Sequence, residues 1–129
     1  MSDIHAFVGF VVVGIFAIGW IWGLGAWIAK RGPGDPYWWW LTAAQVVAGL
    51  QAVLGIVLLL MGRRPGTWLH LVYGFGPLLV LGIAHVVARE GQKVKPGVEP
   101  MKPWVPFGWA AFICFGLTLR GLMTGLGIG

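Results

Sequence analysis

The sequence predicts an all-α integral membrane protein, organised as an up-down four-helix bundle in one transmembrane domain over residues 1–129. Three observations support this prediction. Hydrophobic residues make up 58% of the chain and charged residues 10%, and the mean hydropathy is +0.83. A soluble domain of this composition would expose too much apolar surface to stay monomeric. Finally, the apolar residues fall into four long runs.

Each run is long enough to cross a bilayer, which takes about 20 apolar residues in a helix. The runs cover approximately residues 5–29, 38–61, 67–88 and 104–126. Because backbone groups in lipid must be satisfied within their own segment, we expect helices and not strands. The separators RGPGDP, GRRPG and REGQKVKPGVEPMKP contain the Gly, Pro and charge typical of loops. The first two are short, so neighbouring helices should be antiparallel.

Lys and Arg are distributed unequally between the two ends of the predicted bundle. Arg63 and Arg64 lie at one end, near the level of Arg120 in the last run. The other end holds Lys30, Arg31, Arg89, Lys93, Lys95 and Lys102. Because cytoplasmic loops are rich in Lys and Arg, we predict a multi-pass protein of the inner (plasma) membrane with both termini outside the cytoplasm. The net charge of +5 then indicates contact with anionic lipid, and no nucleic-acid partner is expected.

The phrase H-x-x-x-G-F occurs at the same end of the first and third predicted helices. It reads HAFVGF at 5–10 and HLVYGF at 70–75. In each copy the glycine, Gly9 or Gly74, lies one turn deeper than the histidine on the same helix face. Glycine leaves bare backbone against which a flat ring can lie. Two imidazoles on facing helices, each above such a space, suit a porphyrin iron with two axial ligands.

The predicted metal ligands are therefore His5 and His70, and the predicted cofactor is haem b. A haem carries two propionates that need cations or water. Arg63, Arg64 and Arg120 lie at the histidine end, and Arg pairs well with carboxylates. Arg120 stands in an apolar run, where an unpaired charge costs at least about 2.5 kcal/mol. No Asp or Glu occurs in any predicted span, so a ligand carboxylate is the expected partner.

This arrangement resembles the membrane b-type cytochromes, in which a four-helix bundle holds haem between histidines on different helices. The resemblance rests on the bundle plan and on His5, Gly9, His70 and Gly74. It implies electron transfer, or a place as a subunit of a larger respiratory complex or homo-oligomer. The chain is then an electron carrier or complex subunit and not a stand-alone enzyme. Two strong axial ligands leave the iron no open position for a substrate.

The remaining polar residues of the spans have structural interpretations. We expect His85 at the cytoplasmic interface, bonded to water or a headgroup, with a role at a quinone site as the alternative. The first run has no histidine at the matching depth, so a second haem is not expected. Gln45 and Gln51 should join helices. Hydrogen bonding to a quinone carbonyl is their alternative role.

Two other functions fit the same residues. The first is a copper site, in which thioethers from Met61 and Met123 join the two histidines, since soft sulfur ligands suit copper. The second is a cofactor-free accessory or assembly subunit, held in a membrane complex by its Gly-rich faces. Hydrolysis lacks a carboxylate pair, and no Gly-rich phosphate loop with Lys and Ser/Thr is present.

Overall fold

The computed structural model describes residues 2–127, and this part of the chain contains helices and no strand. The four helices are α1 (Ser2–Ile28), α2 (Asp35–Leu60), α3 (Leu69–Gly91) and α4 (Trp104–Gly125). Each is long and apolar enough to cross a membrane. The prediction of an all-α four-helix membrane bundle is confirmed, and the protein is a multi-pass membrane protein.

The helix ends lie within three residues of the predicted ones, and the differences have local causes. Gly34 has a φ of 81°, which ordinary L-residues rarely adopt, and Pro36 stands in the first turn of α2. Together they start α2 at Asp35, earlier than the apolar run alone indicates. Gly62, with a φ of 83°, turns the chain away at the other end of α2.

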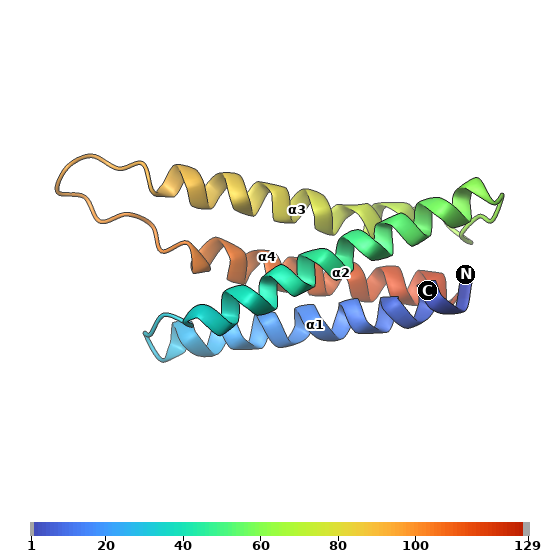
Figure 1. Ribbon diagram of the computed structural model, residues 1–129, viewed down its shortest axis with the longest axis horizontal. Coiled ribbons are helices and arrows are strands. Elements are labelled where there is room, and N and C mark those ends of the chain that lie inside the picture. The colour runs from blue at the N-terminus through green and yellow to red at the C-terminus, as the bar shows by residue number, and fades with distance from the viewer. Residues whose placement is uncertain (1, 128–129) are drawn as a thin grey trace.

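The helices pack in antiparallel neighbouring pairs (Figure 1). α4 packs extensively on α1 and on α3, and α2 packs mainly on α1. The contact between α2 and α3 is the smallest of the four, and the backbones of α1 and α3 do not approach each other closely over residues 2–127. α1 and α3 are therefore diagonal partners, as expected for an up-down bundle.

We call the end where α1 and α3 begin the cavity end, and the opposite end, where α2 and α4 begin, the packed end. Most of the buried core lies toward the packed end and the middle of the bundle. It includes Phe16, Tyr37, Leu41, Phe107 and Cys114, each at most 5% exposed. Small alanines of α2, α3 and α4 fill the spaces between these larger side chains.

The outward faces of the helices are apolar as well. Large hydrophobic side chains are exposed along all four helices, among them Phe7, Ile21, Val46, Leu60, Leu79 and Trp109. A water-soluble bundle would place polar residues on this surface. The exposed apolar surface therefore supports a lipid bilayer as the surroundings of the protein.

Candidate functional site

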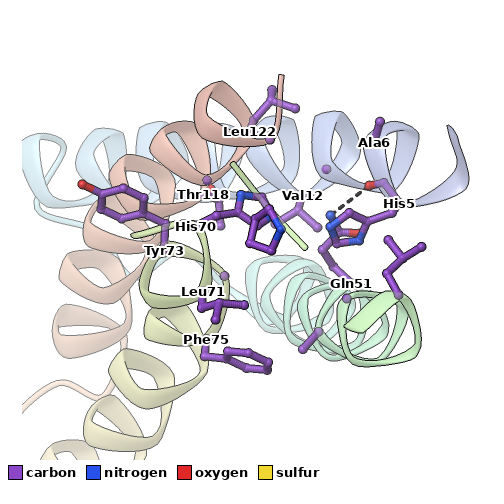
Figure 2. A pocket seen from close by; sticks show the side chains of 18 of the residues that line it. His5, Ala6, Val12, Gln51, His70, Leu71, Tyr73, Phe75, Thr118 and Leu122 are labelled. Carbon is purple, nitrogen blue, oxygen red and sulfur yellow. Dashed lines mark hydrogen bonds between the residues drawn. The ribbon is translucent and has the colours of Figure 1, made fainter. Parts of the chain in front are cut away.

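A cavity of about 380 Å³ lies at the cavity end of the bundle and is lined by residues of all four helices. Figure 2 shows its walls from close by, with His5 and His70 projecting toward each other. The sequence predicted seven site residues, and six of them line this cavity: His5, Gly9, Arg63, Arg64, His70 and Gly74. Small-molecule sites commonly enclose about 300–1,000 Å³, so the cavity is at the lower end of that range.

The two histidines of the repeated phrase meet across the bundle. Although they stand 65 residues apart in sequence, their ring centroids are 6.0 Å apart, with 71° between the ring planes. His5 belongs to the first turns of α1, and His70 to the first turn of α3. Because α1 and α3 are diagonal, the two rings bridge the space that the helices leave open between them.

The glycines that lie against the rings are not the ones that the repeated phrase singled out. An ideal Cβ on Gly55 would lie 3.4 Å from Cε1 of His5, and one on Gly125 would lie 3.0 Å from Cε1 of His70. Gly55 is on α2 and Gly125 on α4, so each imidazole lies against the backbone of another helix. The spacing of residues along a single helix cannot predict a contact between two helices.

Gly9 and Gly74, the glycines of the phrase, differ from each other. A Cβ on Gly74 would meet no atom within 4 Å, so this position opens into the cavity. A Cβ on Gly9 would lie 3.3 Å from Nε2 of Gln51 and 3.4 Å from Cδ1 of Leu122. Gly9 is therefore a close-packing position, whereas Gly74 provides the expected free space.

Two polar side chains hold the histidine residues in place. The Nδ1 atom of His70 is hydrogen-bonded to Oγ1 of Thr124 on α4 at 3.0 Å. Nε2 of Gln51 on α2 donates to the backbone carbonyl of His5 at 2.9 Å. The sequence predicted that Gln51 joins helices, and this bond joins α2 to α1. Thr124 was missed, and its only signal was a polar residue near the histidine end of the last span.

Two buried polar atoms at the cavity lack a hydrogen-bond partner within the described part of the chain. They are Nδ1 of His5 and Oε1 of Gln51. An unpaired buried polar atom costs about 1–3 kcal/mol. The cavity wall is therefore mostly apolar with a few polar atoms left to bond, which is the composition of a site for a small molecule or for ordered water.

The arginines separate into two groups. Arg63 and Arg64 are exposed and line the cavity from the segment that connects α2 to α3. Arg120 does not line it. The guanidinium carbon of Arg120 lies 5.7 Å from the ring centroid of Tyr73, and its Nη1 lies 3.9 Å from Sδ of Met123. The cation–π contact with Tyr73 thus offsets part of the cost of placing the Arg120 charge in an apolar span. A ligand carboxylate was expected to do this.

The third histidine lies away from the cavity. Nε2 of His85 is hydrogen-bonded to Oε1 of Gln45 on α2 at 2.9 Å, and its ring contacts Phe107 at a centroid distance of 4.9 Å. His85 therefore has a protein partner, where water or a headgroup was expected. The pair joins α2 to α3, the two neighbouring helices that pack least.

The proposed sulfur ligands for copper do not line the cavity. Met61 and Met123 are both absent from its wall. No group of three or more His, Cys, Asp or Glu side chains comes together anywhere in residues 2–127. The side chains at the cavity wall whose chemistry suits a metal ligand are thus the two imidazoles, those of His5 and His70.

Comparisons with known proteins give no relative from which a role can be transferred: no protein-family model, curated protein or solved structure matches the chain. The class that the chain itself defines is a four-helix multi-pass membrane protein with a histidine-paired cavity at one end.

Proposed function

We propose that the protein binds haem b in the cavity, with His5 and His70 as the two axial ligands, and that it transfers electrons within a membrane. The observation that carries this proposal is the approach of the two rings, 6.0 Å between centroids, at the wall of one cavity.

The distance between the rings suits two imidazoles on one metal. Imidazole nitrogens lie about 2 Å from a bound metal, which puts the ring centroids on opposite sides of the metal about 6 Å apart. Both ring planes need only contain the axis through the metal, so they can be rotated about it relative to each other. The observed 71° between the planes of His5 and His70 is compatible with this arrangement.

The cavity offers an apolar slot with cations near it. Gly74 leaves an open wall, and Arg63 and Arg64 stand at the chain segment that closes the end of the bundle. Carboxylates of a bound porphyrin would pair there with guanidinium groups. Because about 380 Å³ is small for a large cofactor, we expect the cavity to widen on binding. The least packed seam, between α2 and α3, is the expected place.

A haem iron would supply one-electron chemistry, and two imidazoles would leave no position for a substrate. The protein then acts as an electron carrier or as a subunit of a respiratory complex, with quinone as a candidate electron partner. The excess of Lys and Arg at the packed end supports an orientation in the inner membrane with the cavity on the outer side.

The test is a reduced-minus-oxidised absorption spectrum of the protein purified in mild detergent from a haem-replete host. Wild type should show the narrow band of low-spin haem. His5→Ala and His70→Ala should both lose it, because each removes an axial ligand. His85→Ala is the matched control. His85 is hydrogen-bonded to Gln45 and does not line the cavity, so this variant should keep the band.

Other outcomes identify the other functions. A folded wild type without the haem band overturns the haem proposal. Bound copper that is lost on replacing Met61 or Met123 would then establish the copper site. If neither metal nor haem is bound, and replacing both His5 and His70 leaves stability and association with a partner complex intact, the protein is a cofactor-free accessory subunit.

A further inference from the structure

Thr124 stands at a junction of hydrogen bonds beside the cavity. It is 6% exposed and lies near the end of α4. Its Oγ1 is 3.0 Å from the carbonyl oxygens of Arg120 and Gly121, and 3.0 Å from Nδ1 of His70. A hydroxyl has one proton to donate and lone pairs that accept. Where that proton lies decides which nitrogen of His70 carries its own proton.

The two carbonyls determine the direction of the hydroxyl proton. A carbonyl oxygen can only accept, so the short contacts with Arg120 and Gly121 are favourable when the threonine proton points toward them. If the proton pointed to His70 instead, the lone pairs of Oγ1 would face two carbonyl oxygens at 3.0 Å. The hydroxyl therefore donates to the backbone of α4. Its remaining capacity toward the imidazole is to accept.

We propose that Thr124 is a positioning residue that holds His70 as the Nδ1–H tautomer and so leaves Nε2 as the nitrogen with a free lone pair. This inference rests on the proposed function in that Nε2 then becomes the metal ligand. Metal-binding histidines typically donate their other ring N–H to a carbonyl, carboxylate or water, which fixes the tautomer and the ring orientation. Here the hydroxyl of Thr124 is the group that accepts the Nδ1–H of His70.

Gly125 supports the same arrangement from the adjacent position. A Cβ there would lie 3.0 Å from Cε1 of His70, 3.6 Å from Nδ1 and 3.8 Å from Nε2. Cε1, the carbon between the two nitrogens, is therefore the ring atom that comes closest to the last turn of α4. Thr124 fixes where the proton is, and Gly125 allows the ring to come close enough for the hydrogen bond.

The first test needs no haem. Nitrogen-15 NMR of histidine-labelled protein in detergent distinguishes the two neutral tautomers, and His70→Ala assigns the signal. Wild type should show His70 protonated on Nδ1. Thr124→Val keeps the shape but removes the hydroxyl, and it should shift the signal toward the other tautomer. Thr124→Ser should restore it.

Thr118 supplies a matched control. It is on the same helix and lines the same cavity, and its Oγ1 donates to the backbone carbonyls of Cys114 and Phe115. Thr118→Val should therefore leave the His70 signal unchanged. Wild-type His70 protonated on Nε2, or an equal shift in Thr118→Val, would overturn the inference.

The second test uses the haem-loaded protein. Loss of such a supporting bond typically weakens metal binding about 10–100-fold, and it makes the ligand less basic. Thr124→Val should therefore lower the affinity for haem by about tenfold or more and raise its reduction potential, while Thr124→Ser stays near wild type. If wild type binds no haem, the proposed function fails, whereas the NMR result still decides the tautomer.

Discussion

At the packed end, aromatic rings pack against one another between the helices, whereas the larger cavity of the bundle lies at the cavity end. Successive edge-to-face contacts join Trp22, Tyr37, Trp38 and Phe107, with centroid distances of 5.4–5.8 Å. At the cavity end, two imidazoles face an open wall. Close packing is what helices in lipid gain by associating, so an unfilled end suggests selection for something other than stability.

The histidines follow the same division. His85 is bonded to Gln45 and lies against Phe107, so its contacts join α2, α3 and α4. His5 keeps a buried Nδ1 without a partner in the described chain, and His70 keeps one nitrogen beyond its bond to Thr124. His85 is likewise hydrogen-bonded through one nitrogen, Nε2, so the histidines differ in location: His5 and His70 line the cavity, where a ligand can reach them, and His85 does not.

The largest expected difference between the two ends is in stability. Phe107→Ala should lower the free energy of unfolding by about 3 kcal/mol, because Phe107 is 5% exposed and its removal leaves a void. Phe75→Ala at the cavity wall should cost less than about 1 kcal/mol, since Phe75 is already 37% exposed. Unfolding in mixed micelles with increasing SDS, followed by circular dichroism, measures both. Equal costs would mean that the ends are packed alike.

A second pair of variants compares glycines. Gly23→Leu should cost about 1–3 kcal/mol by overpacking. A Cβ there would lie 3.2 Å from the Tyr37 hydroxyl and 3.4 Å from Cα of Gly108. Gly74→Leu should change stability by no more than about 0.5 kcal/mol, because a Cβ there meets nothing within 4 Å.

The two glycine variants should have the opposite order of effect on haem binding, where Gly74→Leu has the larger effect. Gly74→Leu fills the cavity and should abolish the haem band, while Gly23→Leu should keep it in whatever protein remains folded. The spectrum and the SDS midpoint are measured on the same samples. A Gly74→Leu protein that retains full haem binding would show that the cavity wall is not part of the site.

The smallest expected effect separates the two glutamines. Gln45→Leu removes the bond to His85 and should cost about 0.6 kcal/mol, the average for such bonds between membrane helices. Gln51→Leu should cost less, because it also removes the unpaired buried Oε1 while losing the bond to the His5 carbonyl. The SDS midpoints of the two variants, measured side by side, test this order. A larger loss for Gln51→Leu would indicate that Oε1 is satisfied in the folded protein.

The sequence by itself determined the four helices and the end at which the two histidines lie. Runs of about 20 apolar residues bounded by Gly, Pro and charge leave few alternatives in lipid. The alternation of direction in a bundle with short connections then brings His5 and His70 to the same level. The core at the packed end was less predictable, because apolar residues surround every helix and no face is marked as the inner one.

Only the tertiary structure decided how the site is built. It placed Gly55 and Gly125 against the imidazoles and brought Thr124 to Nδ1 of His70. It also placed the guanidinium of Arg120 over the ring of Tyr73, so that Arg120 itself does not line the cavity. Each of these contacts joins different helices, and each depends on how far a helix is rotated about its axis. A hydrophobic pattern that is uniform around the helix carries no information about that rotation, whereas side-chain packing between helices fixes it.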